Sequence, residues 1–360
     1  MTRPPESPVA SLAPRERESP VASLAPREPE SPVASLAPTE RDSAGLPEFG
    51  LFFRLNDTQA DPVRQYHDGL DLIVHAERLG LSTAWITSHH FRSDKGTIAS
   101  PLVFLAAASQ RTSRIRLGAG VVVITLENPI RVAEDAVIAD ALSNGRLQLG
   151  LGSGLEDWAF EPFGVDWDDR LRVYADKVAR LRSVLDGEDL GGGRRLYPPA
   201  GALRQKLWRV ASDPAHAEEI GRVGDNLLLR SSKALTFEGN LARHSEAIDA
   251  FRSNAGPQQR IAASRTVIVA DTVAQARQLA GQAAIDLHVK HGNGVPWYGD
   301  PELVRDRLRN DPELDHVDEV LLQVAPAKLT LAQWKNNLDL IVSEVLEPVR
   351  REGRAELLSR

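Results

Sequence analysis

Between residues 47 and 353 the chain alternates short apolar runs with longer segments in which apolar residues recur every three or four positions. The short runs are rich in β-branched residues and predict buried strands, whereas the longer segments predict amphipathic helices. Strands are expected at 49–53, 82–87, 115–124, 147–151, 207–211, 226–229, 264–270 and 320–324, each followed by a helix. Eight strand–helix units predict an α/β fold, a closed parallel (β/α)8 TIM barrel, because an open doubly wound sheet usually has about five or six strands.

Capping residues indicate several helix boundaries. Asn128-Pro129 and Asp300-Pro301 each place an N-cap side chain before a proline, whose missing N–H costs nothing in the first helical turn. Further helices are expected from Val63 to Gly80 and at 101–111, 170–185, 214–223, 241–251 and 272–288. The last helix carries Leu338, Ile341, Val342, Val345 and Val349 on its inner face.

Residues 1–46 have a different composition. Three near-copies of the phrase Glu-Ser-Pro-Val-Ala-Ser-Leu-Ala-Pro begin at Glu6, Glu18 and Glu30, with a period of 12 residues. Two prolines in each copy prevent a continuous helix or a central strand, so we expect a disordered repeat tail. A docking arm for a partner is the functional alternative. Residues 354–360 are expected to form a short C-terminal tail.

Charge and composition exclude several classes of function. A net charge of −7 without a local run of Lys or Arg gives no footprint for a phosphate backbone, so no nucleic-acid partner is expected. The chain has no cysteine, which excludes disulfides, thiolate metal ligands and cysteine nucleophiles. No apolar stretch reaches the ~18 residues of a membrane span and no signal peptide is recognisable. We therefore expect a cytoplasmic location and no membrane partner.

The most distinctive candidate chemistry follows the second strand. The active site of a parallel barrel lies at the carboxyl ends of its strands, which places His89 and His90 at the barrel mouth. An imidazole titrates near neutral pH and can act there as an acid or a base. The alternative is a polar rim histidine that merely caps the strand. No second cluster of His, Asp or Glu follows at ligand spacing, so no metal site is expected.

The fourth strand ends in a glycine-rich stretch, Gly150-Leu-Gly-Ser-Gly154. Leu155 replaces the third glycine of the dinucleotide-binding fingerprint, and glycine at position 152 excludes a nucleophile elbow. Two interpretations remain. Either the glycines let a ligand approach the backbone while Ser153 and nearby N–H groups hold an anion, or they allow close packing of neighbouring elements.

Further candidates follow strands five to seven. Ala211 and Ser212 precede a helix whose N-terminus is a natural phosphate seat, although a simple N-cap would have the same sequence. Arg230 after strand six and Arg265 in strand seven could neutralise a phosphate. For both arginines a structural ion pair is the favoured role.

Several phrases in this order resemble the luciferase-like monooxygenase family over nearly all of residues 48–350. They are AERLG at 76–80, SHHF at 88–91, RIRLG at 114–118, NPIRVAED at 128–135 and SNGRLQLGLGSG at 143–154. The FMN-dependent subgroup is the most similar, because SPLVFL at 100–105 and GGGRRLYP at 191–198 also recur there.

The resemblance implies an enzyme that uses reduced FMN and O2 to oxygenate a small organic substrate, with the flavin delivered by a separate NAD(P)H-dependent reductase. It implies that His89 is catalytic with His90 beside it, and that Gly120-Val121 lies against the isoalloxazine, often through a non-proline cis peptide. The implied cofactor-binding residues are Phe53, Gly120, Val121, Ser153, Gly154, Ala211, Ser212, His216 and Arg230. Ser88 departs from the family pattern, in which many relatives carry Glu before the paired histidines.

Two alternatives stay open beside this function. One is a deazaflavin-dependent hydride-transfer oxidoreductase on the same barrel, and the other is a non-catalytic flavin-binding partner subunit. A homodimer is implied by the family resemblance. The glycine-containing segments 187–205 and 291–298 are expected to be specificity elements or lids. Phe53, Phe91 and Ile124 are candidates for lining the pocket.

Overall fold

The computed structural model describes residues 45–56, 61–92, 94–231, 237–281, 297–324 and 329–358. Residues 1–44, which make up nearly all of the expected disordered tail, lie outside the described residues. The same holds for residues 291–296 of the second expected lid.

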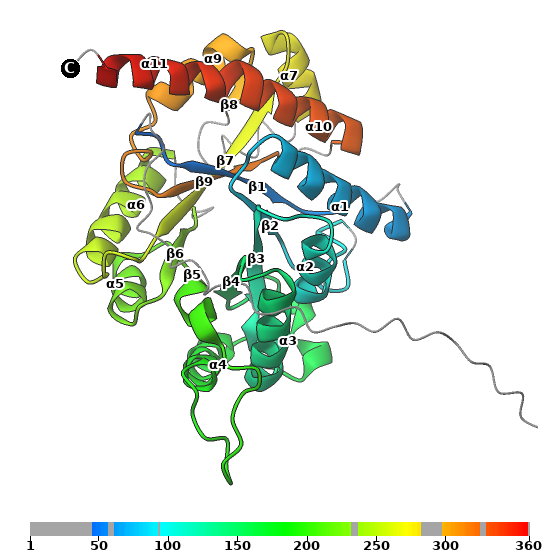
Figure 1. Ribbon diagram of the computed structural model, residues 1–360, viewed down its shortest axis with the longest axis vertical. Coiled ribbons are helices and arrows are strands. Elements are labelled where there is room, and N and C mark those ends of the chain that lie inside the picture. The colour runs from blue at the N-terminus through cyan, green and yellow to red at the C-terminus, as the bar shows by residue number, and fades with distance from the viewer. Residues whose placement is uncertain are drawn as a thin grey trace, which may run out of the picture. The chain divides into compact units, whose positions relative to one another are not determined.

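Eight parallel strands form a closed barrel (Figure 1). They are β1 (Glu48–Phe53), β2 (Thr83–Ile86), β3 (Arg116–Val123), β4 (Leu147–Gly152), β5 (Leu207–Ala211), β6 (Asn226–Leu229), β7 (Ile261–Val269) and β9 (Glu319–Gln323). Each strand from β1 to β7 pairs with the next along the chain, and β9 closes the ring by pairing with both β7 and β1. The barrel prediction is confirmed, and β5 and β6 have the predicted bounds.

One strand was not expected. The short β8 (Trp297–Gly299) pairs in parallel with the carboxyl-terminal part of β7, outside the ring. Trp297 is buried in the hydrophobic core. This end of the expected lid segment 291–298 is therefore part of the sheet.

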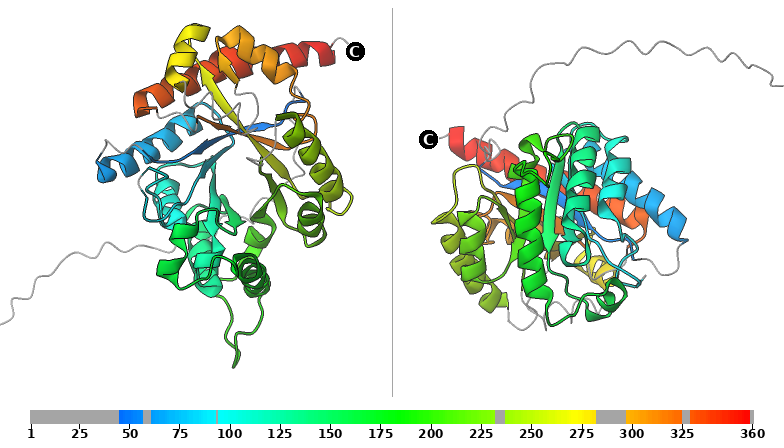
Figure 2. Two further views of the ribbon diagram at one scale, coloured as in Figure 1. Left: turned by 180° about the vertical axis from the view of Figure 1, so that it is seen from behind. Right: turned by 90° about the horizontal axis from the view of Figure 1, so that it is seen from below.

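Helices surround the barrel (Figure 2). They are α1 (Pro62–Arg78), α2 (Pro101–Ser109), α3 (Pro129–Leu142), α4 (Arg170–Leu185), α5 (Pro214–Arg222), α6 (Phe237–Arg252), α7 (Val273–Ala280), α9 (Pro301–Arg309), α10 (Leu331–Leu340) and α11 (Glu347–Leu358). The expected N-caps are present, since Asn128 accepts from the N–H of Ile130 and Asp300 from that of Leu303. Helix α11 continues beyond residue 353, where the barrel domain was expected to end.

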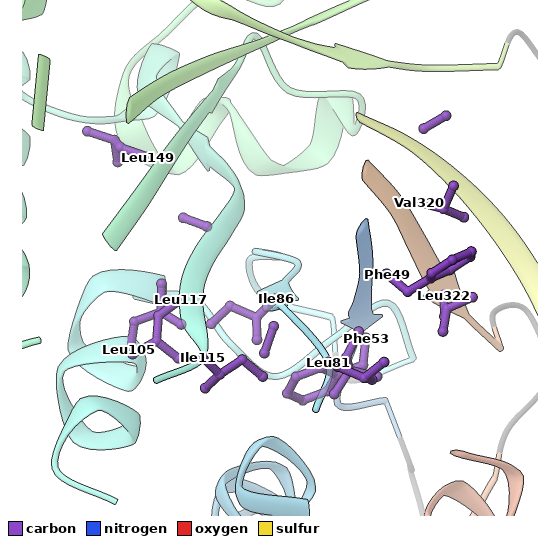
Figure 3. Close-up of a cluster of buried hydrophobic side chains, with 14 of the residues drawn as sticks. Phe49, Phe53, Leu81, Ile86, Leu105, Ile115, Leu117, Leu149, Val320 and Leu322 are labelled. Atoms are coloured by element: carbon purple, nitrogen blue, oxygen red, sulfur yellow. The ribbon is translucent and has the colours of Figure 1, made fainter. Parts of the chain in front are cut away.

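The main core lies between the strands and the helices (Figure 3). Phe49, Leu51 and Phe53 of β1 belong to it, whereas Phe52 contacts a second cluster inside the barrel. That inner cluster contains Trp85, Trp208, Leu228, Ala262 and Leu321. Alternate residues of each strand thus face the helices or the barrel interior. No helix within the described ranges is long and apolar enough to cross a membrane.

Candidate active site

A cavity of about 810 Å³ opens at the carboxyl ends of the strands. Its volume is within the usual range of small-molecule sites, roughly 300–1,000 Å³. The inner cluster supplies part of its lining, namely Phe52, Trp85, Val121, Val210, Leu228, Ala262 and Leu321. The indole rings of Trp85 and Trp208 meet edge to face with their centroids 5.4 Å apart. The lower part of the cavity is therefore apolar and built from side chains fixed by the barrel.

The cavity collects nearly all of the predicted site residues. Those that line it are His89, His90, Gly120, Val121, Ser153, Gly154, Ala211, Ser212, His216 and Arg230. They come from β2 to β6, so residues separated by more than 140 positions meet in one pocket as the barrel geometry predicts.

Phe53 is the exception among the predicted cofactor-binding residues. It is 3% exposed and packs in the outer core near Leu81, so its assignment to the cofactor site is wrong (Figure 3). The preceding residue, Phe52, lines the cavity instead, because neighbouring side chains on a strand point to opposite faces. The other two suggested aromatic or aliphatic lining residues also miss the cavity, since Ile124 is buried in the core and Phe91 is largely exposed.

The insertion 187–205 is not a lid over this cavity. None of its residues lines the cavity, and it connects the end of α4 to the beginning of β5. A connection from a helix to the next strand lies at the amino ends of the strands, which is the face opposite the mouth. Figure 1 shows this loop projecting beyond α4.

His89 is held by its neighbours on both sides of the ring. Its Nδ1 lies 3.2 Å from Oε2 of Glu156, and its backbone N–H donates to the carbonyl of Ile98 at 2.9 Å. A Cβ atom at Gly96 would lie 2.8 Å from the His89 ring, so the glycine permits the close packing that orients it. Because a carboxylate accepts hydrogen bonds, Nδ1 carries the proton and Nε2 is the free lone pair of the neutral ring.

The surroundings of His89 favour its neutral form. Burial lowers the pKa of His89, the Glu156 carboxylate opposes that shift, and the positive charges of Arg54 and Lys95 add to it. Glu156 follows β4, so this carboxylate reaches the histidine from a different strand than position 88, where Ser88 replaces the Glu of many relatives. Sequence reasoning missed Glu156.

His90 has a different environment. It is 7% exposed and its ring meets Phe163 edge to face at 5.1 Å, while the Phe91 ring lies tilted to it with the centroids 5.9 Å apart. Burial lowers the pKa of His90, and the neighbouring His89 adds to the shift. Within the described ranges no three His, Asp or Glu side chains are grouped as a metal site. His90 is thus an aromatic neighbour at the rim.

The non-proline cis peptide that the resemblance implied is present on β3. The Gly120–Val121 peptide is cis, and the pairing of β3 with β4 shifts register between Ala119 and Val122. The glycines of β4 accommodate this irregular strand. A Cβ at Gly150 would lie 2.2 Å from the carbonyl oxygen of Ala119, and one at Gly152 would lie 2.4 Å from the Val121 side chain. Close strand packing therefore accounts for these two glycines.

The mouth of β5 and β6 has the features of an anion site. Asp213 caps α5 by accepting from the N–H of His216 at 3.0 Å, and Arg230 lies 3.4 Å from the Ser212 hydroxyl. Arg209 donates to Nε2 of His216 at 3.0 Å, which leaves the proton of the neutral ring on Nδ1. The hydroxyls of Ser153 and Ser212, the cation of Arg230 and the N-terminus of α5 line this side of the cavity together with the Asp213 carboxylate that caps the helix.

Arg265 has the structural role that was favoured for it. It is 7% exposed, and it donates to both carboxylate oxygens of Asp311 at 2.6 and 3.0 Å and to Glu313. It does not line the cavity, whereas its neighbour Ser264 does. Burial opposes the charge of Arg265, but the two carboxylates outweigh burial and raise its pKa.

Several polar lining residues were missed by sequence reasoning, and three of them bear on the chemistry of the site. Arg54 follows β1 directly, Glu156 follows β4, and Tyr174 reaches the cavity from α4. The rule that directs the search to the residues after each strand would have included Arg54 and Glu156. Tyr174 carries no such signal, because its position on a helix is typical of core packing.

The sequence is similar to those of two known monooxygenases. Limonene 1,2-monooxygenase of Rhodococcus erythropolis is 37% identical over 149 residues, which is 41% of this chain and 38% of that protein. The oxygenase component of the flavin-dependent trigonelline monooxygenase of Acinetobacter baylyi is 33% identical over 194 residues, 50% of this chain and 53% of that protein. The chain thus spans less than two thirds of both relatives.

A longer match links the chain to a different activity. The 5,10-methylenetetrahydromethanopterin reductase of Methanolobus tindarius is 28% identical over 270 residues, covering 73% of this chain and 76% of that protein. Among solved structures, the oxygenating constituent of 3,6-diketocamphane monooxygenase from Pseudomonas putida, in complex with FMN, superposes with a TM-score of 0.68. That superposition covers 83% of this chain and 98% of the other at 17% identity, so it shows a shared fold.

The family model described as luciferase-like monooxygenase matches residues 48–326. This range begins with β1 and extends past β9, so it includes all eight strands of the ring and every residue that lines the cavity. The chain therefore belongs to the luciferase-like monooxygenase family.

Proposed function

We propose that this protein oxygenates a small organic substrate with O2 and reduced FMN. One observation carries the proposal: a single cavity joins the oriented ring of His89, the cis peptide at Gly120–Val121 and the anion site at Ser212. Two of the relatives are named as monooxygenases, and the 3,6-diketocamphane enzyme was solved with FMN.

The residues of the cavity fit FMN. An apolar surface formed by Trp85, Val121 and Leu228 suits a flat aromatic ring, and the hydroxyls and Arg230 on the β5–β6 side suit its phosphate. Bound flavin supplies the oxidising chemistry, which the cysteine-free chain does not provide.

The chain's own residues have two tasks. The apolar lining excludes water from the reacting groups, which limits loss of protons to solvent. His89 is neutral near pH 7 and is held with Nε2 as its proton acceptor, so it can take a proton at that atom and return it. Glu156 fixes this tautomer and stabilises the ring when it becomes charged.

Removal of the His89 imidazole tests the proposal. His89→Ala is expected to lower turnover by about 10²-fold or more, the usual contribution of a positioned acid–base group, without weakening FMN binding. Anaerobic titration with reduced FMN measures binding, and O2 consumption with a panel of organic substrates measures turnover. His67→Ala, an exposed histidine on α1, is the control. A fully active His89→Ala protein would remove this residue from the mechanism.

A second candidate is hydride transfer with a deazaflavin cofactor. The match to 5,10-methylenetetrahydromethanopterin reductase favours it, because that match covers the largest share of this chain among the relatives described above. Parallel titrations with FMN and with coenzyme F420 separate the two. Tight binding of F420 alone, with no O2 consumption, would replace the monooxygenase proposal.

We also propose a separate flavin reductase and a homodimer. The relative from Acinetobacter baylyi is named as an oxygenase component, which supports a two-component system. Exposed apolar side chains on adjacent helices support self-association, namely Val103 on α2 and Ile138 and Leu142 on α3. Light scattering of the full chain in solution tests the dimer, and a monomer mass would refute it.

A further inference from the structure

Arg54 is a cation for which the described part of the chain offers no hydrogen-bond acceptor. It follows β1, lines the cavity and is partly buried, yet it has no hydrogen-bond acceptor among the described residues. A guanidinium has five N–H donors, and no nitrogen of Arg54 is among the buried polar atoms without a partner, so its donors are open to the cavity and to a ligand there. Burial lowers the pKa of Arg54, and the charge of Glu156 opposes that shift. The group stays positively charged at any physiological pH.

The backbone beside Arg54 is held in place. The carbonyl of Leu55 accepts from the N–H of Thr97 at 2.7 Å, and the carbonyl of Thr97 accepts from the Tyr66 hydroxyl at 2.8 Å. The same loop carries Lys95, a second cation in the cavity lining. Because the backbone at Leu55 is bonded to the loop that carries Lys95, Arg54 and Lys95 lie at the same corner of the cavity mouth.

This corner has an excess of positive charge. The nearby anions are Glu156, whose carboxylate already bonds to His89, and Asp94, which pairs with Arg92 at 2.9 Å and lies near Lys95. Arg54, Lys95 and Arg92 against these two carboxylates leave one positive charge, because His89 is neutral near pH 7. Charged groups inside a cavity are normally paired, so the excess indicates an anionic ligand.

The corner is distinct from the proposed phosphate site. Arg54 follows β1 and Ser212 follows β5, and four steps around a ring of eight strands separate them. The two sites therefore lie on opposite sides of the mouth, and one phosphate does not reach both. Between them lie the cis peptide at Gly120–Val121 and the ring of His89.

We propose that Arg54 is a specificity-determining residue that binds the carboxylate of an organic-acid substrate beside His89. The rest of the substrate is apolar, because Leu155 and Trp158 line the same cavity and expose apolar surface at its rim. A carboxylate matches the planar fork of the guanidinium, and the phosphate of the proposed flavin is assigned to the opposite side of the mouth. The inference rests on the proposed function for the identity of the second ligand, the flavin.

The test measures ligand binding to the full chain by calorimetry, with and without saturating FMN. The probes are benzoate, phenylacetate, nicotinate and octanoate, each compared with its neutral amide. We expect at least one acid to bind about tenfold more tightly than its amide. Arg54→Gln should abolish the preference, and Arg54→Lys should retain part of it, because Lys keeps the charge but loses the fork.

Two control variants separate the possible failures. Arg230→Gln should weaken FMN binding and leave the acid preference intact, and Arg64→Gln, an exposed arginine on α1, should change neither. Loss of FMN binding in Arg54→Gln, with the acid preference unchanged, would assign Arg54 to the cofactor and overturn the inference. The absence of any acid preference in the wild type would overturn it as well. An Arg54-dependent preference without FMN binding would sustain it while refuting the proposed flavin.

Discussion

Two arginines at the barrel wall differ in whether nearby carboxylates pair with their positive charge. Arg265 on β7 faces the helix layer and donates to Asp311 and Glu313, and it is 7% exposed. Arg54 after β1 faces the cavity and lacks an acceptor among the described residues. Arg265 is buried and Arg54 is partly buried, yet among the described residues only Arg265 has carboxylates that accept its hydrogen bonds.

This difference indicates where the protein can bind a charged ligand. In a buried ion pair each charge is already compensated, so neither group is left to bind a ligand. A cation without a partner in a cavity lowers the stability of the ligand-free protein. It gains a favourable interaction when an anionic ligand binds. Function is therefore expected at Arg54 and stability at Arg265.

The largest expected effect is on stability. Arg265→Met leaves Asp311 and Glu313 buried without their cation, and we expect a loss of about 3–5 kcal/mol in the free energy of unfolding. Arg54→Met removes no hydrogen bond to a side chain or carbonyl among the described residues, so its cost should be below about 1 kcal/mol. Urea unfolding of the full chain measures both. An equal loss of unfolding free energy in the two variants would contradict the proposed difference between Arg265 and Arg54.

The buried pair also predicts a response to acid. Burial opposes ionisation of Glu313, but Arg265 and His244 outweigh burial and lower its pKa from 4.5 to about 2. Since the folded pKa is below the unfolded value, the contribution of Glu313 is complete above about pH 4.5 and is lost as the pH falls towards about 2. In that window we expect a loss of roughly 3 kcal/mol.

Unfolding in urea across that pH range measures the loss. Between about pH 4.5 and about pH 2, Glu313→Gln should lose less stability than the wild type, because its side chain does not titrate. Glu344→Gln, an exposed position, should keep the wild-type slope. If Glu313→Gln also keeps that slope, the carboxylate is not the titrating group.

Sequence patterns were sufficient for the ring of strands. Apolar runs bounded by caps and glycines located all eight, because a strand buried on both faces is continuously apolar. The same property hid the direction of side chains. In β1 both Phe52 and Phe53 are apolar, so the pattern did not indicate which of them faces the cavity. The three-residue β8 was too short to show any periodicity.

The candidate site was predicted where motifs were distinctive. Paired histidines and repeated glycines are rare enough to attract notice, and His89 and Ser153 lie in the cavity. Arg54 and Glu156 were missed because a single charged residue after a strand is typical of a solvated loop. Only the closed ring shows that these two side chains share a pocket with His89.

The smallest predicted effect concerns the carboxylate between the two functional groups. Glu156→Gln keeps a hydrogen-bond partner for Nδ1 of His89 but removes the negative charge, which opposes the lowering of the His89 pKa by burial. The pKa of His89 should therefore fall further, and the acidic limb of the rate–pH profile should move to lower pH. Turnover near pH 7 should fall by about tenfold or less, because the ring stays neutral and only the stabilisation of its charged form is lost. An unchanged limb would mean that His89 does not titrate in that profile. A gain in affinity for carboxylate probes in the same variant would sharpen the contrast between the arginines, because it would show that Glu156 partly compensates Arg54.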